Sequence, residues 1–190
     1  MILFLQTPQP ESPATLSTKL LTEKIEYIES GTKSLEDFKG KVMLLSLYGR
    51  GSGEAAGKLS ADLAPKFAKE KDFVRVSVAD LTGAPGFLKG SIRKGVRDGA
   101  KKGEEKTKSL FENEKLEYKP ENSSVYLLDW KGIVAKELGV GGKTGRTYQI
   151  FVIGKKGEIL FRYSQPPEPP KSDDSQKKIE DEIKKALETK

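Results

Sequence analysis

A glycine-rich loop after the most apolar run of the chain holds the residues best placed to bind a ligand. The run over residues 42–48 is typical of a central buried strand, and residues 49–53 after it read Gly-Arg-Gly-Ser-Gly. If a helix begins at the end of this loop, its free amides favour an anion, and Arg50 adds a cationic partner. The loop lacks the spacing of a phosphate-binding P-loop, so a plain tight loop is the alternative reading.

The residue types missing from the chain exclude several kinds of chemistry. There is no cysteine and no histidine, so no thiolate, disulfide, histidine base or Cys/His-ligated metal is possible. Carboxylates remain as ligands for a hard cation, but none are spaced as in a calcium loop, and we expect no metal and no cofactor. Tyr48, Ser52 and Glu54 suggest a hydrolytic group that has no histidine base. We therefore expect the protein not to be an enzyme.

Two sets of cations are further candidates for binding, in a chain with a net charge of +6. Residues 141–146 form a second glycine-rich loop, whose Lys143 and Arg146 make a basic rim with Arg50 if the two loops are neighbours. A predicted helix carries a basic face made of Lys89, Arg93, Lys94, Arg97 and Lys101. Solvated cations are the alternative reading of both sets.

The basic face also raises nucleic acid or another anionic polymer as a partner. Modules that recognise nucleic acids normally add stacking aromatic residues or a known motif, and Phe87 is the nearest aromatic residue here. We therefore consider nucleic acid an unlikely partner and keep it as an alternative. A steep loss of binding with added salt would support it.

The order of predicted elements gives the framework for these residues. Apolar periodicity and turn residues predict strands at 42–48, 73–79, 124–128, 148–153 and 158–163 and helices at 54–70, 85–101, 132–138 and 177–187. Residues 16–30 are predicted as a helix or a mixed helix and strand, and residues 102–122 as a polar loop with a short element near Leu110 and Phe111. This order predicts an α/β sandwich with a central mixed sheet flanked by helices.

The N-terminal residues differ from the rest of the chain. Residues 1–6 are apolar and residues 7–13 are polar and rich in proline. The apolar run is too short to span a membrane and lacks the basic start of a signal peptide. We expect residues 1–15 to be disordered or the remnant of an export segment, and a single domain over 16–187 with a polar insertion at about 84–122. The protein is then periplasmic or otherwise exported; a frayed N-terminus is the alternative.

Three segments resemble the thioredoxin-like superfamily, in particular peroxiredoxins and exported thioredoxins: residues 37–45, 128–140 and 151–159. They are similar to the entry to the first core strand, to an Asp-x-x-Gly turn before a short helix, and to the final hairpin. Within the superfamily, residues 49–52, 84–87 and the hairpin look most similar to the YtfJ family of small exported proteins. The resemblance implies a thioredoxin-like sandwich.

The resemblance also implies where a redox site would be, and this chain departs from it there. The Cys-x-x-Cys positions fall on Ser52, Gly53, Glu54 and Ala55, and the peroxiredoxin cysteine falls near Ala56. The cis-proline position falls near Thr147 and Tyr148, where a non-proline cis bond would cost about 2.5–4 kcal/mol.

We therefore expect a non-catalytic, redox-inactive module or scaffold that binds another protein. The alternative is an oxidoreductase homologue by descent whose chemistry is missing. The sequence assigns no oligomeric state.

Overall fold

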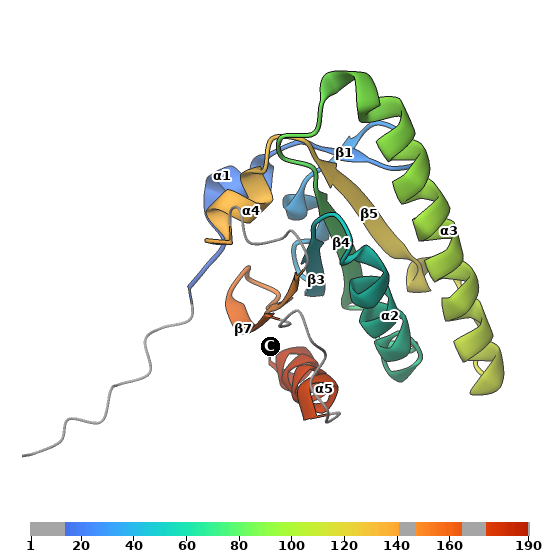
Figure 1. The fold of residues 1–190 in the computed structure, drawn as a ribbon. Coiled ribbons are helices and arrows are strands. Elements are labelled where there is room, and N and C mark those ends of the chain that lie inside the picture. The colour runs from blue at the N-terminus through green and yellow to red at the C-terminus, as the bar shows by residue number, and fades with distance from the viewer. Residues whose placement is uncertain (1–13, 141–146, 165–173, 190) are drawn as a thin grey trace, which may run out of the picture.

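A seven-stranded mixed sheet forms the centre of the molecule (Figure 1). The computed structural model describes residues 14–140, 147–164 and 174–189. The strands are β1 (Ile25–Tyr27), β2 (Thr32–Lys33), β3 (Val42–Tyr48), β4 (Phe73–Asp80), β5 (Ser124–Asp129), β6 (Tyr148–Ile153) and β7 (Ile159–Ser164). Their order across the sheet is β2-β1-β5-β4-β3-β6-β7. Strands β3, β4 and β5 are parallel, whereas β6 pairs antiparallel with β3 and β1 antiparallel with β5.

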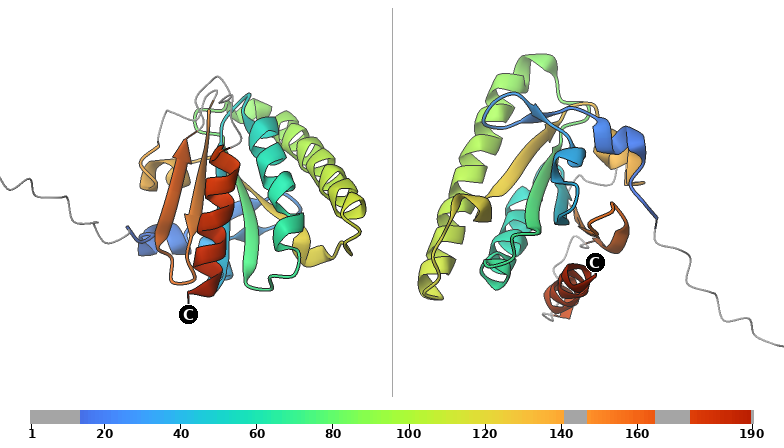
Figure 2. Two further views of the ribbon diagram at one scale, coloured as in Figure 1. Left: turned by 90° about the horizontal axis from the view of Figure 1, so that it is seen from below. Right: turned by 180° about the vertical axis from the view of Figure 1, so that it is seen from behind.

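Helices cover both faces of the sheet (Figure 2). They are α1 (Thr18–Thr22), α2 (Gly53–Leu63), α3 (Lys89–Asn113), α4 (Ile133–Glu137) and α5 (Asp174–Glu188). Helices α2, α3 and α5 lie side by side on one face, and α1 and α4 lie on the other. This α/β arrangement confirms the predicted fold class.

Strand β3 contributes side chains to the hydrophobic cores on both faces of the sheet. Its alternate side chains enter two different cores: Leu45 and Leu47 pack on the α1 and α4 side, whereas Val42 and Leu44 pack on the α2 and α5 side. All four are fully buried. A strand that is apolar on both faces is central, as the sequence predicted, and its bounds agree with the prediction.

The predicted loop over residues 102–122 is wrong for residues 102–113, because α3 continues to Asn113. Thr107 and Phe111 lie one helical turn apart and are both buried, and the ring of Phe111 meets that of Tyr118 edge-on at 5.2 Å. The loop was predicted from the polarity of this stretch, but Lys, Glu and Leu are good helix formers, and the buried face at Thr107 and Phe111 adds the tertiary packing from which most helical stability comes.

Other boundaries differ by less. Residues 16–30 are the mixed alternative, a short helix followed by β1. Helix α2 ends at Leu63 rather than at residue 70, and Pro65 opens a short 3₁₀ helix to Phe67. None of the helices in the described part of the chain is both long and apolar enough to cross a membrane.

Candidate functional site: the start of α2 and the groove beside it

Ser52 occupies the position at which the sequence resemblance places the first redox cysteine. Its side chain is buried, and its Oγ lies 2.9 Å from the carbonyl oxygen of Thr147 and 3.2 Å from both the amide nitrogen and the carbonyl oxygen of Gly49. The hydroxyl therefore donates to a carbonyl and accepts from the Gly49 amide. These bonds join the loop after β3 to the residue before β6, so Ser52 acts as a structural tie.

The other residues of this predicted site are placed as follows. Gly53 begins α2, and Glu54 and Ala55 are exposed on its first turn. The described residues include Thr147 and Tyr148 and contain no cis peptide bond. Burial raises the pKa of the Tyr148 hydroxyl to about 12, so this group stays protonated at neutral pH.

The predicted basic rim is only partly described. Arg50 is exposed on the loop before α2 and lines the groove described below. Lys143 and Arg146 lie outside the described residues, so the rim that joins them to Arg50 stays a prediction.

The predicted basic face of α3 is divided between protein contacts and solvent. Arg93 donates to Glu26 on β1 at 2.9 Å, and Trp130 donates to the same carboxylate at 2.8 Å. The hydrogen bond from Arg93, with that from Trp130, holds the pKa of Glu26 below its usual range despite partial burial. Arg97 donates to the carbonyl of Ile28 at 3.1 Å.

These contacts attach the first half of α3 to the edge of the sheet. Lys89 belongs to the same attachment, since its Nζ lies 5.2 Å from the centre of the Trp130 ring. Lys94 and Lys101 are exposed. Of the five predicted residues, therefore, three hold the helix in place and two face solvent.

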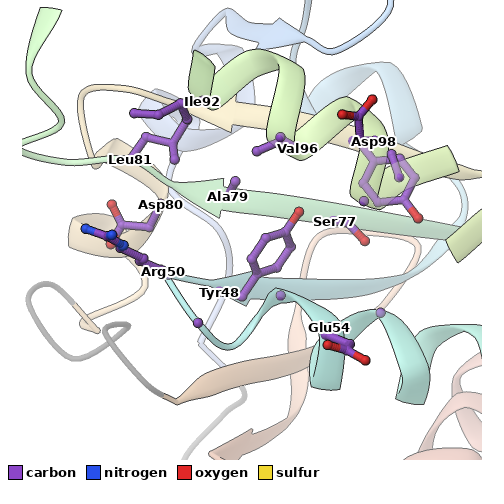
Figure 3. A pocket seen from close by; sticks show the side chains of 18 of the residues that line it. Tyr48, Arg50, Glu54, Ser77, Ala79, Asp80, Leu81, Ile92, Val96 and Asp98 are labelled. Atoms are coloured by element: carbon purple, nitrogen blue, oxygen red, sulfur yellow. The ribbon is translucent and has the colours of Figure 1, made fainter. Parts of the chain in front are cut away.

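A groove of about 1400 Å³ lies between α2 and α3 (Figure 3). Its floor is the sheet, where Tyr48, Ser77 and Ala79 face the groove from β3 and β4, and Tyr126 lines it from β5. Ile92 and Val96 line it from α3. The groove opens at the carboxyl ends of the parallel strands, which is where ligands bind in open α/β sheets.

Charged side chains line the two helical walls in matching order. Both helices follow the carboxyl ends of parallel strands and run in the same direction, and the contact of Asp62 with Lys106 places these two positions side by side. Glu54 on α2 and Asp98 on α3 stand on opposite sides of the groove (Figure 3), and we name this pair the acidic rung. One turn further along each helix, Lys58 and Lys102 form the basic rung.

A third pair closes the groove one more turn along. Lys106 on α3 donates to Asp62 on α2 at 3.1 Å, and we name it the closing pair. No ion pair or hydrogen bond of the side chains of the acidic and basic rungs occurs within the described part of the chain. The two members of each rung carry the same sign, so they cannot form an ion pair with each other across the groove.

Several positions of α2 and α3 that line the groove are glycines and carry no side chain. A Cβ at Gly53 would lie 3.1 Å from the Tyr48 ring, and one at Gly103 would lie 3.0 Å from the Tyr126 hydroxyl. The lack of a side chain at these two positions therefore gives the two tyrosines room. A Cβ at Gly57, Gly95 or Gly99 would meet nothing within 4 Å. Packing within the described chain does not require these three glycines, although each costs a helix roughly 1 kcal/mol relative to alanine.

A buried arginine beneath α2 is a further feature that the sequence analysis missed. Arg75 on β4 is almost fully buried; its guanidinium donates to the carbonyl of Ser60 at 3.0 Å and to that of Asn122. Burial lowers its pKa to about 10, which still leaves it charged at neutral pH. Arg75 therefore ties the end of α2 to the turn before β5. Its place within an alternating strand pattern gave no signal of this.

The groove itself was also missed, although its signals are in the sequence. Glycines recur every fourth residue at 95, 99 and 103, and charged residues recur with the same period at 54, 58 and 62 and at 98, 102 and 106. A period of four indicates one helix face. The two series could be matched only once α2 and α3 were known to be neighbours.

Comparison with solved structures finds the same fold in thioredoxin-like proteins. A thiol:disulfide interchange protein DsbE from Chlorobium tepidum, described as putative, matches with a TM-score of 0.57 and 17% identity over 93% of this chain and 98% of its own. A mutant of PrxQ from Xylella fastidiosa matches with a TM-score of 0.62 and 16% identity over 96% and 100% of the two chains. A secreted disulfide oxidoreductase from Mycobacterium tuberculosis matches with a TM-score of 0.57 and 11% identity over 89% and 99%.

These likenesses establish a thioredoxin-like fold in a chain that has no cysteine. No family model matches the sequence, and no curated protein matches it. The resemblance to the YtfJ family therefore stays a prediction.

Proposed function

We propose that this protein is a redox-inactive, non-enzymatic binding module that acts outside the cytoplasm and holds a segment of another protein in the groove between α2 and α3. The observation that carries the proposal is the groove itself, in which the side chains of Glu54, Lys58, Asp98 and Lys102 make no ion pair within the described chain. Sites for small molecules are usually about 300–1,000 Å³, and the volume here, about 1400 Å³, suits a larger occupant.

The residue at the first redox cysteine position, Ser52, supports a non-catalytic role. Ser52 is buried and bonded to both loops, so it has neither the chemistry nor the exposure of a nucleophile. The exposed apolar residues support a protein partner: Phe87 is 87% exposed, and its neighbour Leu88 lines the groove. Aromatic residues at the centre of interfaces commonly carry much of the binding energy.

Fold likeness to a protein described as secreted supports an extracytoplasmic location. Fractionation of cells that make the protein, with markers for each compartment, tests this part separately.

Site-directed photocross-linking tests whether the groove is the binding site. A photoreactive amino acid replaces Gly99 on the groove wall or, as the control, Lys177, which is exposed on α5. Irradiation of cells should give a covalent adduct with another protein from position 99 and none from position 177. Equal adducts from both positions, or none from position 99, would overturn the groove as the site.

A further inference from the structure

The charges along the groove specify the kind of segment that fits it. The acidic and basic rungs are one helical turn apart on both walls, which is a rise of about 6 Å. The two members of each rung carry the same sign, so neither wall neutralises the other. An occupant that satisfies both rungs needs a cationic group at one level and an anionic group about 6 Å away.

The shape of the groove favours an extended occupant. The side chains of the closing pair bridge α2 and α3 at 3.1 Å, so they bound the groove at that end. A helix is about 10 Å across with its side chains, whereas neighbouring extended chains are spaced by about 4.8 Å. In an extended chain, alternate side chains point the same way and are about 6.6 Å apart, close to the separation of the rungs.

Glycines on both helical walls also favour an extended segment. Gly57 on α2 and Gly95 and Gly99 on α3 line the groove and would meet nothing if they carried a Cβ. They leave room for a backbone to approach the helices closely. The hydroxyls of Tyr48 and Tyr126 add polar groups on the floor, whereas the buried Ser77 hydroxyl is bonded to that of Ser124.

We infer that the groove binds an extended polypeptide segment of a partner protein in which a basic and an acidic side chain alternate, at positions i and i+2. The basic side chain lies between Glu54 and Asp98, and the acidic side chain lies between Lys58 and Lys102. This inference rests on the proposed function and adds the chemistry of the partner to it.

Selection of peptides from a random library displayed on phage tests the charge pattern. Three full-length proteins serve as bait: the wild type, a Glu54→Lys/Asp98→Lys variant in which both rungs are basic, and a Glu112→Lys/Glu188→Lys control. The control changes two exposed acids outside the groove and has the same net charge as the rung variant. Circular dichroism checks that all three fold.

The wild type and the control should enrich a basic and an acidic residue two positions apart, and the rung variant should enrich acidic residues at both positions. A selected wild-type peptide should bind the rung variant about tenfold more weakly, since two modest ion pairs become repulsive. The inference would be overturned if the wild type enriches residues of one sign only, a charged pair at another spacing, or no peptide. It would also be overturned if the rung variant and the control select the same peptides. A cross-link from position 99 together with any of those results would leave the proposed function standing and remove only the charge pattern.

Discussion

The start and the flank of helix α2 differ in whether their polar side chains find bonding partners within the protein. At its start, Ser52 is buried and bonds to Gly49 and Thr147. These bonds hold in place the loop at which the sequence resemblance puts a redox site. Along its flank, Glu54 and Lys58 face α3 across an open groove and make no ion pair within the described chain. The difference teaches that polar residues which lack a partner inside the protein are a better guide to its binding surface than the inherited position of an active site.

Helix α3 shows the same contrast between its two sides. Its inner side is held by buried Phe111 and by the bond from Arg93 to Glu26, whereas its groove side carries glycines and unpaired charges. We expect substitutions on the attached sides to lower stability and substitutions on the groove sides to leave it unchanged or raise it.

The largest effect is expected at the inner side of α3. Phe111 is fully buried, and Phe111→Ala removes its contact with Tyr118 and leaves a cavity. The free energy of unfolding, measured with urea, should fall by about 3–5 kcal/mol. Phe87→Ala is the matched control, since Phe87 is exposed, and should change it by less than about 0.5 kcal/mol. Equal losses in the two variants would contradict the attachment of α3 through Phe111.

The tie at Ser52 should give the next largest effect. Ser52→Ala leaves the Gly49 amide and the Thr147 carbonyl without their side-chain partner in a buried place, which should cost about 1–3 kcal/mol of stability. Ser91→Ala on the exposed groove side of α3 is the control and should change stability by less than about 0.5 kcal/mol. If Ser52→Ala is as harmless as the control, the loop is not held by this hydroxyl.

The bond between Glu26 and Arg93 predicts a dependence on pH. Because the folded protein lowers the pKa of Glu26, its carboxylate contributes stability above the unfolded pKa, near 4.3, and loses it as pH falls through the lower folded value. Glu26→Gln should therefore cost up to about 1 kcal/mol at pH 7, and the gap from the wild type should shrink below pH 4. Thermal unfolding of both proteins between pH 3 and pH 7 measures this gap. A constant gap would show that charge does not contribute.

The smallest effect should be a gain in stability on the groove side. Gly99→Ala adds a methyl group that meets nothing and should stabilise α3 by about 0.5–1 kcal/mol. Gly53→Ala is the comparison, because its methyl would press on the Tyr48 ring at 3.1 Å and should bring no such gain. Thermal unfolding of both variants decides the matter. A loss of stability in Gly99→Ala would mean that the glycine serves packing within the protein.

Much of the fold could be predicted from local pattern, and the groove could not. The apolar run of β3 and the turn between β6 and β7 are signals within single segments, and both were predicted correctly. The second half of α3 depends on Phe111 packing beneath it, which no local signal within a polar stretch reveals. The groove depends on the register between two helices, in which Asp62 contacts Lys106, 44 residues away in sequence.

The contacts made by the basic face of α3 could not be predicted for the same reason. Arg93 and Arg97 have the spacing of a solvated helix face, but β1 supplies Glu26 and the residue after it supplies the carbonyl of Ile28. A cation that has an acceptor elsewhere in the chain looks the same in sequence as a cation left for a partner. Lys58 and Lys102, which have no acceptor among the residues that the structure describes, were not singled out.

Thiol labelling in cells tests most directly whether the groove is occupied. The chain has no cysteine, so a Gly99→Cys or Lys177→Cys variant carries a single thiol, and both positions are exposed in the protein alone. The labelling rate of each variant is measured in intact cells with a permeant maleimide and compared with that of the purified protein, corrected by a short unstructured peptide thiol made in the same compartment. We predict that labelling at position 99 is slowed about tenfold in cells, as expected for a partner present at roughly ten times its Kd, while labelling at position 177 is unchanged. Equal rates at position 99 in cells and in the purified protein would contradict the account.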